Sequence, residues 1–497
     1  MSQNITSSTI GKATAWSFAA ELAAKLLVPI TNIILARILV PEVFGIIATI
    51  NMVISFAETI SAAGFNKYIV QHNFATKEEL YKSSNVAFWT NFSISCLAWL
   101  LIFFFRGKIS SYVGNPGYGI PLVVASLAIP LTALSSIHES LFQRALNYKI
   151  LFIRRLAVSL LPFVVTVPLA LLGLSFWSLI IGSLASCILK IVLLSINSEW
   201  KPVFYYRFPL LKKMFSFSAW TLFESIAMWA STYIDILIIS NSLGAYYTGL
   251  YKNSQYIVTS ILTIITGATT SVLFASLSRF QDDKSQFESV FYSFQKNTAV
   301  FVIPLGLGIY CYSDVITYLL LGPRWEEASV FVGIWGLCTS LVAVFGTYCR
   351  EVYRAKGEPK VSLVAQIFHL LFVVPICLVF VKRGFVELSY ARSFAYLQII
   401  FVHFVIVQWR YNISVRKMFF IIKEPLFCAL LMLVLSYSLK LVLGTGYFLQ
   451  IIEATICIIA YFALLLLFPG YREDYHKCIY KLMGIIHLKY DRQKFRE

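Results

Sequence analysis

The stretch IILARILVPEVFGIIATIN, Ile33–Asn51, ends one apolar run and begins another, with a turn at Val40-Pro41-Glu42. Proline has no amide hydrogen to donate and its φ is fixed, so Pro41 suits the first turn of a helix and not the middle of one. The stretch therefore predicts a hairpin of two long apolar helices.

Apolar runs of this kind recur along all 497 residues. Apolar residues make up 59% of the chain and charged residues 13%, against about 25% charged in soluble domains. Each run is long enough for a hydrocarbon core of about 30 Å. We therefore predict an all-α polytopic membrane protein with about fourteen spans. Their predicted residues are 15–37, 43–65, 84–105, 118–137, 156–173, 176–197, 215–239, 246–278, 298–320, 328–349, 361–381, 388–409, 425–443 and 448–468.

The positive charge of the chain lies in short connecting segments. The formal net charge is +17, and 30 of the 41 Lys and Arg residues fall in segments on the same side as the N-terminus. This is the positive-inside pattern of a polytopic protein, and it argues against nucleic-acid binding. It places both termini in the cytoplasm.

The hairpin has a weaker copy 204 residues later, in ISNSLGAYYTGLYKNSQ. Trp16 aligns with Trp220 and Gly45 aligns with Gly249 at this offset. Six spans separate the copies, and six is even, so both halves enter the membrane in the same direction and a cavity is expected between them. Chance similarity between apolar segments is the alternative explanation. The predicted parts are a six-helix lobe at 1–205, a second at 206–412, two extra helices at 413–470 and a basic amphipathic tail on the cytoplasmic surface at 471–497.

The chain shows no pattern of metal-binding or catalytic residues. Its nine cysteines lie mostly in apolar runs and form no CxxC or Cys/His cluster, so neither a disulfide framework nor a metal site is indicated. We predict no cofactor and no catalytic residue.

Charged and amide side chains inside the predicted spans are the candidate functional residues. A charge at the bilayer centre costs at least about 2.5 kcal/mol, so such residues usually face a partner or a wet cavity. Their spacing places them on single helical faces within the first, second and seventh spans. Either a structural ion pair or a polar transport path explains these faces. The residues assigned to a polar, ion-coupling path are Glu21, Asn32, Asn51, Glu58, Glu224 and Asp235.

Several cations also lie in the spans. Lys25, Arg37, Lys252 and Arg392 are the candidates for binding an anionic substrate. Arg37 lies at the end of its span, where contact with substrate and contact with lipid head groups both remain open. Lys190 and Lys440 lie near span ends and are expected to reach the interface. His369 and His403 are interpreted as hydrogen-bonding core residues.

Five segments resemble Wzx-type exporters of lipid-linked oligosaccharides, in the colanic-acid and teichuronic-acid branch of the multidrug/oligosaccharidyl-lipid/polysaccharide transporter superfamily. The segments are ILARILVPEVFG (34–45), GFNKYIVQ (64–71), FWSLIIGSL (176–184), YIDILIISNSLGAYYTGLY (233–251) and LLGPRWEEA (320–328).

This resemblance implies a V-shaped pair of lobes in the bacterial inner membrane. The lobes would move an undecaprenyl-pyrophosphate-linked repeat unit to the outer leaflet by alternating access, driven by H⁺ or Na⁺. It also implies a role in lipopolysaccharide or exopolysaccharide synthesis beside a polymerase and other assembly proteins. The alternatives are a multidrug antiporter of the same superfamily and a polymerase or ligase. The resemblance implies a cationic central cavity, and the chain departs from a strongly basic one in having Glu21 beside Lys25, which argues against simple charge attraction.

Overall fold

The computed structural model describes residues 27–62, 64–444 and 446–473, and all of the regular structure in these residues is helical. The predicted site residues Glu21 and Lys25, and residues 474–497 of the predicted basic tail, lie outside the described residues. The all-α polytopic prediction is confirmed.

The first part of the described chain begins with the apolar helix Leu27–Ile38. The elements that follow are α2 (Pro41–Ala62), α3 (Phe65–Gln71), α4 (Lys77–Tyr112), α5 (Gly119–Ser126), α6 (Ala128–Arg144), α7 (Tyr148–Val164), α8 (Thr166–Leu171), α9 (Phe176–Asn197) and α10 (Phe208–Arg279).

The second part begins with a sharply bent pair of helices. Its elements are α11 (Lys284–Cys311), α12 (Ser313–Leu320), η1 (Pro323–Ala328), α13 (Ser329–Val342), the π-helical turn η2 (Ala343–Thr347), α14 (Tyr348–Ala355), α15 (Pro359–Phe380), η3 (Val381–Arg383), α16 (Phe385–Arg410), α17 (Val415–Ile421), α18 (Lys423–Leu443) and α19 (Tyr447–Leu465).

Eleven helices in the described residues are long and apolar enough to cross a membrane, and the pair α11 and α12, bent by 86°, makes a twelfth. That count treats α10 as one span. However, α10 is broken at Gly244, whose φ of 82° suits glycine and few other residues, so it contains two helices. With these two counted separately, and with Leu27–Ile38 included, the number agrees with about fourteen.

The predicted limits of the fourth and fifth spans were wrong by several residues. The helix of the fourth span continues to Arg144, and that of the fifth begins at Tyr148. The connection is therefore much shorter than predicted, and charged residues assigned to it lie in helices instead.

Lys190 and Lys440, which we expected to reach the interface, both have protein partners. The Lys190 ammonium group forms an ion pair with Glu139 at 2.9 Å. Lys440 likewise donates to a protein atom, the Cys311 carbonyl. Both lysines therefore contact protein acceptors, and their contact with lipid head groups stays a prediction.

The chain divides into two compact units that do not follow sequence order. Unit 1 contains residues 1–264, 317–332 and 358–399, and unit 2 contains residues 265–316, 333–357 and 400–497. The division into two repeated lobes stays a prediction.

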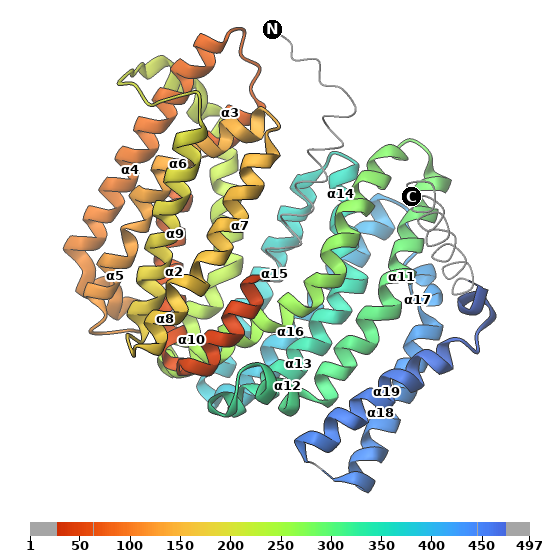
Figure 1. Cartoon of the computed structure of the whole chain (residues 1–497). Coiled ribbons are helices and arrows are strands. Elements are labelled where there is room, and N and C mark those ends of the chain that lie inside the picture. The colour runs from red at the N-terminus through yellow and green to blue at the C-terminus, as the bar shows by residue number, and fades with distance from the viewer. Residues whose placement is uncertain (1–26, 63, 445, 474–497) are drawn as a thin grey trace, which may run out of the picture. The chain divides into compact units, whose positions relative to one another are not determined.

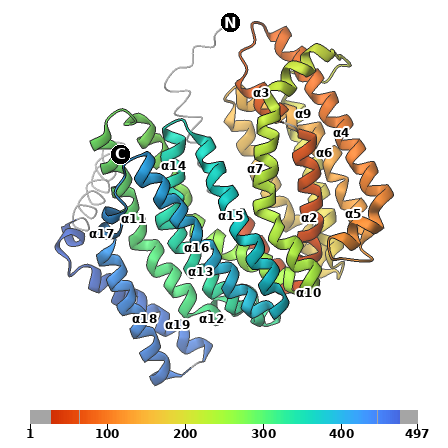
Figure 2. The same cartoon turned by 180° about the vertical axis from the view of Figure 1, so that it is seen from behind.

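Within unit 1, helices α4, α6 and α9 run side by side (Figure 1), and α2 packs against α6 (Figure 2). The apolar faces of α2, α4, α5, α6 and α9 form one core. Its buried members are Ile46, Ile50, Ile54, Ala57, Ile102, Leu122, Ala125, Ala128, Ile129 and Ile180.

Within unit 2, the terminal helices α18 and α19 pack on each other and on α11. The Tyr461 hydroxyl donates to the Val300 carbonyl at 2.9 Å, which fixes α19 on α11. Burial of this hydroxyl is tolerated because it has an acceptor.

A close helix approach in unit 1 joins the predicted hairpin to its predicted copy. A Cβ atom added to Gly45 would lie 1.8 Å from the Ala245 carbonyl oxygen, and one added to Gly249 would lie 1.9 Å from the Pro41 carbonyl oxygen. Glycine pairs allow helix backbones to touch in this way. The start of α2 therefore crosses α10 at backbone distance, just beyond the break at Gly244.

We predict that Gly45→Ala destabilises the protein by about 1–3 kcal/mol, the usual cost of overpacking, because the added methyl group forces the two helices apart. The measurement is the thermal unfolding midpoint of the purified protein in detergent. Gly107→Ala is the matched control, since a Cβ atom there meets nothing within 4 Å. An equal midpoint for Gly45→Ala and Gly107→Ala would refute the close crossing.

Candidate functional site

A buried ion pair joins α10 to α16 in unit 1. The Arg392 guanidinium donates to Oδ2 of Asp235 from Nε at 3.3 Å and from Nη2 at 3.2 Å. Asp235 is 3% exposed and Arg392 is 5% exposed. An ionised carboxylate at this depth requires such a partner, because burying it alone would be very costly.

The same carboxylate is held by the far side of the α10 break. The Tyr251 hydroxyl donates to Oδ2 of Asp235 at 2.5 Å, and the Gln255 amide donates to the Tyr251 oxygen at 2.8 Å. The backbone N–H of Ile236 donates to Oδ1 at 2.9 Å. Since Asp235 and Tyr251 lie on opposite sides of Gly244, this contact ties the two arms of α10 together.

Lys252 lies next to this centre. Its ammonium group is 5.6 Å from the centre of the Tyr233 ring, a cation–π distance, and it lies within electrostatic reach of Asp235. Its side chain is partly exposed, and it has no ion-pair partner within 4 Å among the described residues. The structure describes three of the four predicted cations: Arg37, Lys252 and Arg392. Of these, Lys252 is the best placed to bind an anion.

The second feature of the site is a set of contacts that we call the hairpin clasp, made of Arg37, Arg324 and Trp325. Arg37 donates to the Tyr318 carbonyl at 3.4 Å and to the Leu319 carbonyl, at the end of α12. In return, Arg324 donates to the Ile38 carbonyl at 3.3 Å, at the end of Leu27–Ile38. The last carbonyls of a helix have no partner within it and carry partial negative charge, so each arginine stabilises the helix end that it contacts.

Trp325 completes the hairpin clasp from within. It is fully buried, its indole N–H donates to the Ala36 carbonyl at 2.8 Å, and its ring meets Phe44 edge-on with centroids 5.2 Å apart. Three segments quoted above for their resemblance, 34–45, 233–251 and 320–328, therefore meet within unit 1. Two of them form the hairpin clasp, and the third provides the glycine crossing and the ion pair.

The structure brings together Asp235, Arg392 and Lys252 and separates the other described candidates. Arg37 contacts protein carbonyls in the hairpin clasp. Glu224 is partly exposed, 3.9 Å from Lys67.

The remaining three candidates lie on the first two helices of the hairpin. Glu58 interacts with the Thr132 hydroxyl and with the charge of Lys190. Asn51 is exposed, and the buried Oδ1 of Asn32 accepts no hydrogen bond from the described residues. The shared helical face therefore does not by itself predict a shared site.

Both predicted core histidines form hydrogen bonds with neutral side chains. His369 pairs with the Gln398 side chain at 3.3 Å, and His403 pairs with the Tyr353 hydroxyl at 2.9 Å. Their interpretation as hydrogen-bonding core residues is confirmed.

Sequence reasoning missed Tyr251, Arg324 and Trp325. All three lie in segments quoted for their resemblance. Tyr251 was not singled out because it is uncharged, and Arg324 and Trp325 were not because they lie between two predicted spans. One signal could have identified Tyr251. It lies 16 residues after Asp235, with Gly244 between them, and two helices that fold back at this glycine bring such residues into contact.

This arrangement can bind an anion through Lys252. Asp235 is already saturated with donors, and no group of three or more His, Cys, Asp or Glu residues in the described part of the chain is placed to hold a metal. Lys252 lies over the Tyr233 ring, beside the Asp235–Arg392 pair, whose charges cancel. A cation in this position attracts an anion or a polar head group.

We predict that Arg392→Met destabilises the protein by about 3–5 kcal/mol, because it leaves the buried Asp235 carboxylate without its counter-charge. The double variant Asp235→Asn/Arg392→Met should recover most of this loss, since no uncompensated charge remains. Thermal unfolding in detergent measures both. Arg383→Met, at an exposed arginine just before α16, is the control. If the double variant is no more stable than Arg392→Met alone, the ion pair does not contribute as described.

Comparisons with known proteins identify the family. The chain matches the family described as "Polysaccharide biosynthesis protein" over residues 34–330. It is 24% identical to the succinoglycan biosynthesis transport protein ExoT of Rhizobium meliloti over 70% of each chain. It is 23% identical to the lipopolysaccharide biosynthesis protein WzxC of Escherichia coli over 82% of this chain and 83% of that protein.

Solved structures support the fold. The lipid II flippase MurJ in an inward closed conformation is similar with a TM-score of 0.73 and 17% identity, over 92% of this chain and 99% of that one. An inward-facing multidrug resistance transporter of the MATE family is similar with a TM-score of 0.60 and 14% identity, over 78% of this chain and 94% of that one. The chain is a multi-pass membrane protein that belongs to the polysaccharide biosynthesis protein family.

Proposed function

We propose that this protein is a flippase that moves a lipid-linked oligosaccharide, carried on undecaprenyl pyrophosphate, from the cytoplasmic to the outer leaflet of a bacterial inner membrane. The observation that carries the proposal is a polar centre, Asp235–Arg392–Tyr251 with Lys252, buried among membrane-spanning helices. The family membership and the transport and flippase names of its relatives support the same function.

In this proposal the hairpin clasp forms the outer gate. The positive-inside pattern assigns the turns after Leu27–Ile38 and α12 to the outer side and both termini to the cytoplasm. Alternating access then requires the hairpin clasp to open after the substrate has entered from the cytoplasm. Its strength comes from a few hydrogen bonds to carbonyl groups, each worth about 1.5–3 kcal/mol when the donor is charged, so it can be opened without unfolding a helix.

Lys252 is the proposed contact for the pyrophosphate, assisted by Lys25. H⁺ or Na⁺ would drive the cycle, with Glu21, Glu58 and Asp235 as the coupling carboxylates. The buried Arg392 is the counter-charge of Asp235, and a coupling cation that entered there would compete with Arg392. A polymerase and other polysaccharide-assembly proteins are the proposed partners downstream.

Two other functions are less well supported. A multidrug antiporter would need a free acidic group for its cationic substrate, but Asp235 is already bonded to Arg392 and Tyr251. A polymerase or ligase would need a catalytic set, and the polar centre supplies none. Drug-resistance assays on a deletion strain test the first alternative. The leaflet in which repeat units accumulate tests the second, because loss of a flippase leaves them on the cytoplasmic side.

We predict that Lys252→Ala lowers polymer export about tenfold or more while leaving the protein level unchanged. A charged hydrogen bond to the substrate contributes about 1.5–3 kcal/mol, and the side chain is not part of an ion pair that holds the described fold. Export is measured as surface polysaccharide, with the protein quantified in membranes.

The matched control is Lys440→Ala, which removes a lysine that also lies near a helix end but donates to the Cys311 carbonyl in unit 2. Normal export in Lys252→Ala would exclude Lys252 as the substrate contact. Reduced export in both variants to the same degree would show that the loss reflects general damage.

A further inference from the structure

A carboxyl group lies fully buried in the terminal helix pair of unit 2. Glu453, on α19, is 0% exposed. Neither of its carboxyl oxygens, Oε1 or Oε2, has a hydrogen-bond partner in the part of the chain that the structure describes. Because an ionised carboxylate buried without a partner is very costly, this group requires a bound positive charge.

Glu453 lies on the face of α19 that packs on other helices of unit 2. Gln450 precedes it by three residues and Cys457 follows it by four, and both are buried. This spacing places the three side chains on one helical face. Helix α19 packs on α18 and on α11 (Figure 1). The carboxyl group is therefore directed between helices and away from lipid.

The bend between α11 and α12 lies against this face. The Cys457 thiol is 3.3 Å from the hydroxyl of Tyr312, the residue between the two helices. The Glu453 carboxylate lies within electrostatic reach of both groups. Since the C-terminal end of a helix carries partial negative charge, Glu453 and the end of α11 attract a cation to the same region.

Lys440, on α18, lies near the bend but bonds to other groups. Its ammonium group donates to the Cys311 carbonyl and is 5.2 Å from the centre of the Tyr312 ring. Lys440 is partly exposed, whereas Glu453 is sealed from the surface. Within the described residues, the carboxyl group of Glu453 therefore has no counter-charge in contact with it.

Further oxygen atoms lie in the same region. Ser436, on α18, is 1% exposed, and its hydroxyl lies near that of Tyr312. Carboxylate, hydroxyl and carbonyl oxygens are hard ligands, which suit hard cations, and Na⁺ is bound at the C-terminal ends of broken helices in transporters. One carboxylate balances one positive charge. A divalent ion would leave a charge uncompensated within the membrane, which is unfavourable.

We propose that Glu453 binds an alkali-metal cation between α19, α18 and the end of α11, with the Ser436 and Tyr312 hydroxyls as further ligands. We call this place the Glu453 site. The bound cation holds the terminal helix pair on α11. The proposal goes beyond the proposed function and does not depend on it, because the Glu453 site lies in unit 2 and the polar centre lies in unit 1.

The experiment records infrared difference spectra of the purified full-length protein in lipid nanodiscs. Sodium chloride is exchanged for choline chloride at constant pH and ionic strength. We expect Na⁺ to shift a carboxylate band in the unmodified protein, and Glu453→Gln to abolish this shift. Glu424→Gln, at a partly exposed glutamate at the start of α18, is the matched control and should keep the shift.

Binding of radioactive sodium to the same samples gives the number of bound ions. Glu453→Gln should lower this number by one. Ser436→Ala should weaken binding at the Glu453 site about tenfold, while Ser438→Ala, at an exposed serine of the same helix, should leave it unchanged. If Glu453→Gln does not fold, the two serine variants carry the test.

Two results would overturn the proposal. The first is a band of a protonated carboxyl group that does not respond to Na⁺ and disappears in Glu453→Gln, because Glu453 would then hold a proton in place of a metal cation. The second is equal sodium binding by the unmodified protein and Glu453→Gln. A protein that binds sodium at Glu453 but moves no lipid-linked unit would contradict the proposed function and leave the Glu453 site standing.

Discussion

The rest of unit 1 depends on the backbone contact between α2 and α10 at Gly45 and Gly249. Two apolar helices in lipid gain little from hydrophobic burial against each other, so close packing and hydrogen bonds must hold them. At this crossing there is no room for a single Cβ atom. The hairpin clasp and the Asp235–Tyr251 bond both lie on elements that this contact positions. In both, hydrogen bonds between polar groups hold helices that the close packing has brought together.

Most of the cations in or beside the apolar helices that are discussed here donate to acceptors of the protein. Arg37 and Arg324 are bonded to carbonyl groups at helix ends, and Arg392 is bonded to Asp235. These cations contribute to the architecture through hydrogen bonds to protein acceptors. Lys252 differs, because it forms no ion pair with a described residue and lies over the Tyr233 ring. That difference separates structural cations from those available to an anionic substrate.

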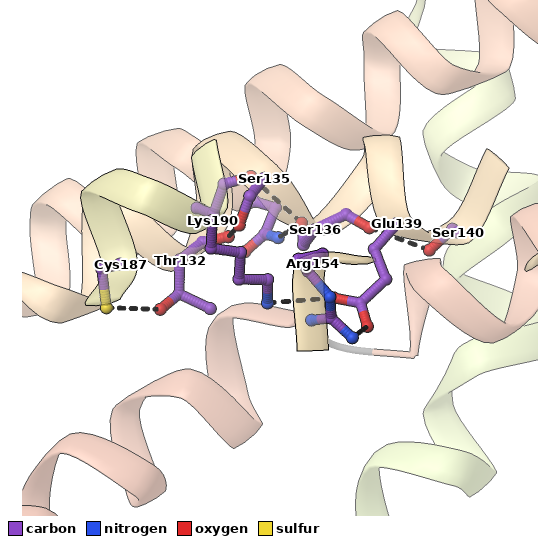
Figure 3. A network of polar contacts seen from close by, with 10 residues as sticks. Thr132, Ser135, Ser136, Glu139, Ser140, Arg154, Cys187 and Lys190 are labelled. Atoms are coloured by element: carbon purple, nitrogen blue, oxygen red, sulfur yellow. Dashed lines mark hydrogen bonds and ion pairs between the residues drawn. The ribbon is translucent and has the colours of Figure 1, made fainter. Parts of the chain in front are cut away.

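Composition and hydrophobic runs predicted the membrane class and most helices, and α9 matches the predicted span 176–197 at both ends. The errors lay at helix ends that carry charge. The hydropathy pattern placed the end of the fourth span before Glu139 and the start of the fifth after Arg154. It therefore could not predict that Glu139 and Arg154 lie in helices and form an ion pair (Figure 3). Helical spacing placed Glu224 and Asp235 on one face but could not show that Arg392, 157 residues away in the sequence, pairs with Asp235. Long-range partners of this kind follow from packing and not from local pattern.

The proposed activity is the movement of lipid-linked oligosaccharides between the two leaflets of the membrane. The most direct measurement reconstitutes the purified protein in liposomes that contain undecaprenyl-pyrophosphate-linked repeat units in both leaflets. An impermeant sugar-oxidising reagent is then added outside. The account predicts that the modified fraction rises from about half to nearly all when the protein and an ion gradient are present. A fraction that stays near half, as in protein-free liposomes, would contradict it.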